Sequence, residues 1–158
     1  MSPGRRASDP RAAHLLNRFA ECFGPVPIPV PVDALAADML GLRVELRDDI
    51  EASGLLYPAT MRVYVNAREA TESEGRRRFT VAHEIGHWVC QCDEGRAAPP
   101  APILCRDTDM ASGAPELERE ANNFAASLLM PEAAMRQAAA EGMQIPEAAE
   151  QFGTNVRA

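Results

Sequence analysis

The apolar residues near the N-terminus recur at helical spacing. Asp9 can accept the first backbone hydrogen bonds of a helix, Pro10 suits its first position, and Gly24 suits its end. The apolar positions between them are Leu15, Leu16, Phe19 and Phe23. This pattern predicts a helix over residues 10–23 that docks on a hydrophobic core.

Strand patterns follow in the first half of the chain. Apolar and polar residues alternate over 42–47 and again over 61–66, and turn residues occur at Ser53-Gly54 and at Pro58. A period of two places one side of each segment on a core. We therefore predict two or three antiparallel strands.

Helical spacing returns in the second half. The predicted helices span residues 74–90, 115–130, 131–141 and 146–152. Between the first two, residues 92–113 are rich in Gly, Pro, Asp and Ala and predict a long loop. A loop of that length is often functional.

These elements predict an α+β protein. Its 158 residues are enough for one domain with a core and few for two. We expect a disordered lead-in at residues 1–8, which lack periodicity, and a single domain over residues 9–158. The last helix is followed by a break at Gly153-Thr154 and a short tail, so the C-terminus is expected to be truncated in a helix-turn-helix-like segment.

The charge balance argues against several classes of partner. With 23 acidic and 16 basic residues the net charge is −7, so phosphate backbones and anionic lipids would repel the chain. No stretch reaches the roughly 18 apolar residues of a membrane span, and the N-terminus lacks the apolar run of a signal peptide. We expect a cytoplasmic protein without direct nucleic-acid or membrane binding. Arg76, Arg77 and Arg78 are interpreted as a solvated face at the start of a helix.

Residues 83–87 read His-Glu-Ile-Gly-His, the pattern H-E-x-x-H. Residues four apart lie on one face of a helix, so His83 and His87 can bind one metal ion, with Glu84 beside the first ligand. Zinc lowers the pKa of a water towards about 7, and a carboxylate at this position can take the proton during attack on a peptide carbonyl. The pattern predicts a zinc hydrolase with Glu84 as general base. Chance occurrence in an unrelated helix is the alternative.

A catalytic zinc site usually has a third protein ligand. Only one further histidine, His14, is present, so a carboxylate is the better candidate. The candidates are Asp107, Asp109, Glu116, Glu118 and Glu120. Glu118 is favoured because Asn122 lies one turn further on the same face, where it can support a ligand. Two alternatives remain. Glu120, about 200° around the helix from Glu118, could be the ligand instead, or all three glutamates could form a solvated face.

Two features stay open on the sequence alone. A residue that stabilises the oxyanion would come from His14, Tyr57 or Tyr64, although both tyrosines more simply pack on a sheet. Three cysteines near or beyond the motif offer a second metal site or a redox switch, and their simpler interpretation is small thiols in the core. They are Cys90, Cys92 and Cys105.

The residues around the motif resemble a known family. Residues 78–87 read RFTVAHEIGH, and residues 118–131 fit ExxANxFAAxLLMP. Both segments are similar to the ImmA/IrrE metallopeptidases. The segments at 31–33, 53–54 and 63–66 also fit the layout of that family, so the resemblance covers about residues 10–155.

The resemblance implies a zincin-like, thermolysin-like core in which a small antiparallel sheet packs on the H-E-x-x-H helix. It assigns zinc to His83, His87 and Glu118 and base catalysis to Glu84. It also implies a bacterial or phage-related cytoplasmic enzyme whose substrate is a helix-turn-helix transcriptional repressor. Cleavage would relieve repression, as in stress responses.

A substrate segment is expected to add as a strand to residues 61–66, interpreted as the edge of the sheet. The rival function is a non-catalytic zinc-containing regulatory module that acts by binding a repressor. The intact Glu84 argues against this rival, because a structural zinc site needs no general base.

Overall fold

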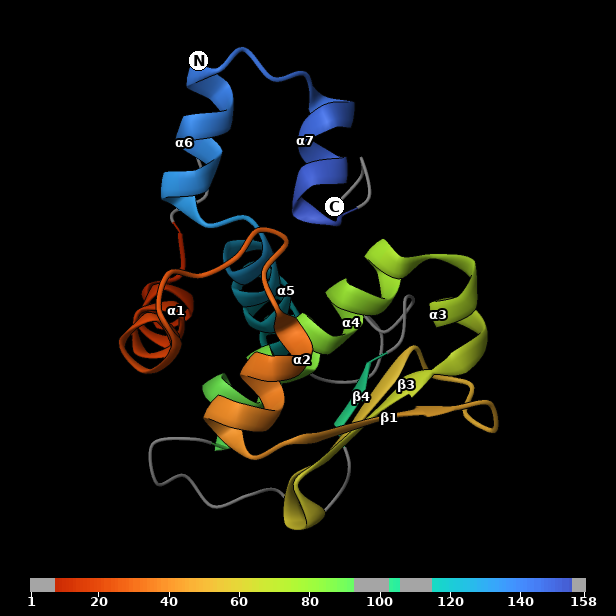
Figure 1. Ribbon diagram of the computed structural model, residues 1–158. Helices are drawn as coiled ribbons and strands as arrows, with labels where there is room; N and C mark the ends of the chain where they lie inside the picture. The colour runs from red at the N-terminus through yellow and green to blue at the C-terminus, as the bar shows by residue number, and fades with distance from the viewer. Residues whose placement is uncertain (1–7, 93–102, 106–114, 155–158) are drawn as a thin grey trace.

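The computed structural model describes residues 8–92, 103–105 and 115–154 (Figure 1). Residues 1–7 of the predicted lead-in, most of the predicted loop and the tail after Thr154 lie outside the described residues. The helices are α1 (Pro10–Phe23), α2 (Val32–Ala34), α3 (Ala67–Glu72), α4 (Glu74–His87), α5 (Pro115–Leu129), α6 (Glu132–Ala140) and α7 (Ile145–Phe152), with π-helical η1 (Leu35–Met39) and η3 (Trp88–Cys92) and 3-10 helical η2 (Pro58–Thr60). The strands are β1 (Arg43–Arg47), β2 (Gly54–Tyr57), β3 (Arg62–Asn66) and β4 (Ile103–Cys105).

Within these residues the four strands form one mixed sheet in the order β1-β3-β2-β4. β1 is parallel to β3, whereas β2 is antiparallel to both β3 and β4. The predicted all-antiparallel sheet is therefore wrong for β1. The chain leaves β1 and enters β2 at the same end of the sheet. After β2, η2 reverses the chain, and β3 then runs between β1 and β2. β3 takes the interior because Val63 and Val65 are buried, whereas β1 carries charged residues at every second position.

The predicted edge at residues 61–66 is also wrong. β3 pairs with β1 on one side and β2 on the other, so a substrate strand has no free side to join. The outer strands are β1 and β4, and β4 lies inside the segment whose composition predicted a loop. Composition missed this strand because it has only three residues, too few to show alternation, within a segment rich in Gly, Pro, Asp and Ala. Its pairing with β2 makes it a strand.

Helix α4 lies on one face of the sheet, and α5 packs along the opposite side of α4 (Figure 1). The buried residues of these layers are Leu56, Val63 and Val65 from the sheet, Val81, Ala82 and Ile85 from α4, and Phe124, Ala125, Leu128 and Leu129 from α5. Two layers of apolar side chains therefore enclose α4. Any polar side chain on its inner faces is removed from water.

Helix α1 confirms the prediction for residues 10–23. Asp9 caps it by accepting a hydrogen bond from the Arg11 amide, and Gly24 ends it with a φ of 89°. Its buried residues, Ala12, Leu15, Leu16 and Phe19, join the same core. None of the helices in the described ranges has the length and apolar character needed to cross a bilayer.

Arg78 contradicts the predicted solvated face. Its guanidinium is buried and donates to the Val30 carbonyl at 2.6 Å and to the Gly153 carbonyl at 3.2 Å. Arg76 and Arg77 instead form ion pairs with nearby glutamates. Successive residues on a helix are about 100° apart, so a run of three arginines cannot face solvent together once both sides of α4 are covered.

Candidate metal centre

Helix α4 carries the H-E-x-x-H motif through the interior of the molecule. His83 and His87 are each 1% exposed, and Glu84 is 0% exposed. The spacing of four residues places both imidazoles on one side of the helix. Their ring centroids lie 4.6 Å apart, and the rings are nearly perpendicular, at 84°.

Glu118, near the start of α5, lies opposite both histidines. Its Oε2 is 2.9 Å from His83 Nε2, and its Oε1 is 3.0 Å from His87 Nε2. The candidate ligand atoms of the three residues all lie within 4.8 Å of one another. One metal ion could be reached by all three side chains without a change of backbone.

The other candidates for the third ligand lie elsewhere or outside the described residues. Glu116 is exposed, and Glu120 forms an ion pair with Arg11 at 2.7 Å. Asp107 and Asp109 lie outside the described residues. Of the described candidates, Glu118 is therefore the one that the structure brings to the histidines.

Asn122, expected to support Glu118, is exposed and makes no side-chain hydrogen bond within the described residues. Its supporting role stays a prediction. Tyr57 and Tyr64 pack edge to face, with centroids 5.3 Å apart. Because Gly54 faces α4 and side chains alternate along a strand, both tyrosines lie on the opposite face of the sheet. Neither is placed to stabilise an oxyanion at the metal centre.

Cys90 and Cys92 are buried at the end of the α4–η3 helix. Burial raises the pKa of the Cys90 thiol to about 12. Such a thiol stays protonated near neutral pH, which fits the simpler interpretation of a small core residue. The side chain of Cys105 lies outside the described residues.

Burial and the imidazoles together set the protonation of the cluster. Burial opposes ionisation of Glu118, but the adjacent imidazoles of His83 and His87 outweigh it and lower the pKa of Glu118 to about 2. Burial also lowers the pKa of His87, although Glu118 acts in the opposite direction. Near neutral pH the site therefore offers a carboxylate and a neutral imidazole, the forms that bind metal.

The donor set fits a divalent metal ion. His87 Nε2 is buried and makes no hydrogen bond of good geometry within the described part of the chain, although Glu118 is near. A buried polar atom without a hydrogen-bond partner lowers the stability of the fold by about 1–3 kcal/mol. A metal between His83, His87 and Glu118 would satisfy it, and two imidazoles with one carboxylate are a ligand set of zinc hydrolases.

Gly54, at the start of β2, fixes the place of Glu84. A Cβ at this position would lie 2.9 Å from Glu84 Oε1 and 2.7 Å from Thr80 Cγ2, closer than packed atoms allow. The strand can approach α4 here only because the residue is glycine. The sequence predicted a turn at Ser53-Gly54, whereas the structure has Gly54 in a strand that forms one wall beside the general-base candidate.

Gly86 is a functional position that the sequence analysis missed. A Cβ here would lie 2.9 Å from the Ala121 carbonyl oxygen and 3.1 Å from Ala121 Cα. The glycine therefore allows α4 and α5 to approach closely enough for Glu118 to reach the histidines. A signal was available, because an interior helical glycine costs about 1 kcal/mol relative to alanine and often has a packing reason.

We expect Gly86→Ala to destabilise the protein. In an open helix this change adds about 1 kcal/mol of stability, but here the methyl group meets the backbone of α5, and overpacking of this kind costs about 1–3 kcal/mol. The shift of α5 should also weaken zinc binding through Glu118. Urea unfolding and chelator competition measure the two effects. A gain in stability with unchanged zinc affinity would contradict the close approach.

Gln91 is a second position that the sequence analysis missed. It lies one turn after His87, in η3, and its side-chain amide is within hydrogen-bond distance of His87 Nδ1. When His87 Nε2 binds a metal, Nδ1 carries the ring proton, and the amide oxygen of Gln91 can accept it after rotation of the amide group. Gln91 would then hold the orientation of this imidazole.

We expect Gln91→Leu to lower zinc affinity by about 10–100-fold, because the leucine cannot accept the Nδ1 proton. Gln91→Glu keeps an acceptor of the same reach and should recover most of the affinity. Both are measured by competition with a chromophoric chelator. Equal affinities for the parent and Gln91→Leu would show that the amide does not orient His87.

Comparison with known proteins agrees with the resemblance seen in the sequence. The Peptidase_M78 family, described as the IrrE N-terminal-like domain, matches residues 37–157. Among solved structures, a Mycobacterium tuberculosis transcriptional regulator is similar, with a TM-score of 0.58 and 17% identity over 92% of this chain. The similarity covers 44% of that protein, so this chain corresponds to less than half of its length, and the likeness concerns the fold. No curated protein matches significantly.

Proposed function

Because this chain belongs to the Peptidase_M78 family of metallopeptidases, we propose that it is a zinc-dependent endopeptidase with a zincin-like core. The observation that carries the proposal is the convergence of His83, His87 and Glu118 beside the buried Glu84. When bound to the first three residues, zinc would supply a Lewis acid and lower the pKa of the attacking water.

In this proposal Glu84 moves the proton. A carboxylate beside the first ligand takes a proton from the water during attack on the peptide carbonyl and then gives it to the leaving amine. Glu84 is 0% exposed and lies against Gly54, so its oxygens are held in one place and bulk water is excluded. The surrounding core thus orients the base before the substrate arrives.

The proposed substrate is a helix-turn-helix transcriptional repressor in the cytoplasm, and its cleavage would relieve repression. The family match to an IrrE-like domain supports a role in regulation, and the similar solved protein is named a transcriptional regulator. The net charge of −7 disfavours direct binding to an operator. An acidic peptidase would therefore act on the regulator protein and not on its DNA.

The proposal is tested with the purified chain and a repressor encoded beside its gene. We expect about one zinc ion per chain and cleavage of the repressor, with loss of cleavage on chelation and recovery on adding zinc. Metal content and the masses of the fragments are the measurements. Stable binding of the zinc-loaded chain to an uncut repressor would favour the rival, a regulatory module that acts by binding. Failure to bind any divalent metal would overturn the metal centre itself.

A further inference from the structure

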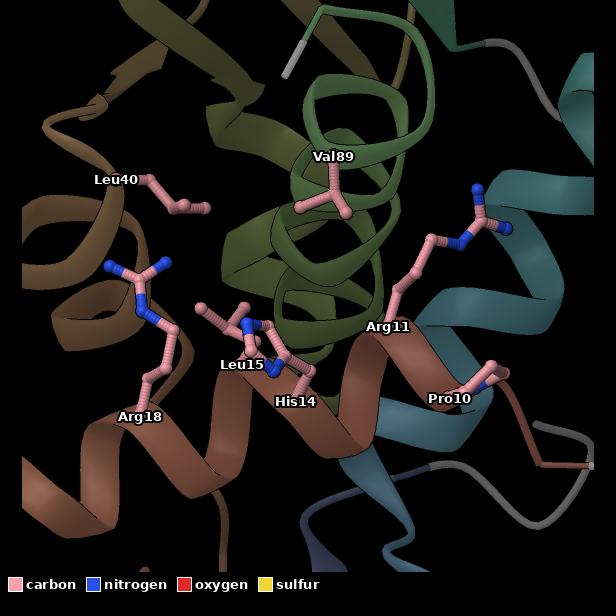
Figure 2. Close-up of a pocket in the computed structure, with 7 residues that line it drawn as sticks. All are labelled: Pro10, Arg11, His14, Leu15, Arg18, Leu40 and Val89. Carbon is pink, nitrogen blue, oxygen red and sulfur yellow. The ribbon is translucent and has the colours of Figure 1, made fainter. Parts of the chain in front are cut away.

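A cavity lies away from the metal ligands, between α1, the end of η1 and the first turn of η3 (Figure 2). Its volume of about 390 Å³ lies within the range of small-molecule sites. Three basic side chains of α1 line it together with four apolar residues: Arg11, His14, Arg18, Pro10, Leu15, Leu40 and Val89. Among these lining residues there is no carboxylate.

Two of the three basic groups are available to a ligand. Arg11 is already engaged, with ion pairs to Asp9 at 3.0 Å and Glu120 at 2.7 Å. His14 and Arg18 are exposed and form no hydrogen bond or ion pair within the described residues. They lie one turn apart on α1, and Figure 2 shows Arg18 extending toward Leu40 with the His14 ring beside Leu15.

The rest of the cavity lining is apolar. Leu15 is buried, and Leu40 and Val89 are partly buried against the core. A ligand that covered them would remove apolar surface from water. The cavity therefore combines an arginine and a histidine that have no carboxylate among the lining residues with an apolar surface, in a chain whose net charge is −7.

We propose that this cavity binds a small carboxylic acid with a short apolar chain. The carboxylate lies on Arg18 and His14, and the chain lies against Leu40 and Val89. A guanidinium presents paired N–H groups that match the two oxygens of a carboxylate. Val89 follows His87 by two residues, so an occupant contacts the helical segment that carries a proposed metal ligand. The proposal does not depend on peptidase activity.

The test is a titration of the zinc-loaded chain with hexanoate, followed by amide NMR shifts. We expect saturable shifts in α1 and around Val89, weaker binding of acetate, which lacks the apolar chain, and weaker binding of hexanol, which lacks the charge. Arg18→Gln should weaken hexanoate binding by about tenfold or more, the effect of losing a charge-assisted hydrogen bond. Arg68→Gln, at an exposed arginine of α3, should change nothing.

Three results would overturn the site. Shifts that rise without saturation show no binding, and equal effects of Arg18→Gln and Arg68→Gln show only a general response to charge. Shifts confined to the residues around His83 and His87 show that hexanoate binds the metal. Repeating the titration on the metal-free chain separates this last case, because binding at α1 should persist there.

Discussion

Replacing Glu84 by glutamine is expected to lower peptide-bond cleavage by about 10²–10⁴-fold, the usual contribution of a general acid–base group. Glutamine keeps the size of the side chain and fills the same space beside Gly54. Its neutral amide cannot take a proton from water. Zinc affinity should stay close to that of the parent, because Glu84 is not among the proposed ligands. Cleavage rates at saturating zinc and chelator competition are the two measurements.

Glu74→Gln is the matched control for this variant. It makes the same chemical change at the exposed start of α4, far along the helix from the motif. The control should cleave at the parent rate. Cleavage at the parent rate by Glu84→Gln would show that Glu84 is not the general base. Loss of zinc binding in this variant would show instead that Glu84 takes part in metal binding.

Removing the carboxylate of Glu118 should have the largest effect on metal binding. Glu118→Ala leaves two imidazoles on α4 with no ligand from α5, and we expect zinc affinity to fall by more than about a hundredfold, since loss of a mere supporting residue already costs 10–100-fold. Cleavage at limiting zinc should fall with it. The affinity is measured by competition with a chelator, and the cleavage rate over a zinc titration.

Glu116→Ala is the control, because Glu116 is exposed in the same first turn of α5. It should bind zinc as the parent does. Parent-like affinity in Glu118→Ala would show that another group, such as Asp107 or Asp109, supplies the third ligand. High zinc affinity restored by Glu118→Asp would further indicate that a carboxylate is required at this position.

The sheet and Arg78 show where local patterns failed. Alternation predicted the positions of β1 and β3, but the pairing and order of the strands depend on contacts between segments distant in the chain, such as β2 with β4. In the sequence, nothing distinguishes Arg78 from its neighbours Arg76 and Arg77. Arg78 differs only because the carbonyls of Val30 and Gly153, far away in the chain, come within reach.

The sequence by itself determined the helices at both ends of the chain and the pair His83 and His87 with Glu84 between them. The reason is that caps, prolines and the 3.6-residue period act over a few residues. Only the tertiary structure decided that Glu118, and not Glu120, faces the histidines. That choice depends on how α5 packs against α4, and this close packing leaves no room for a side chain at Gly86. Contacts of this kind join residues distant in sequence, where no local pattern records them.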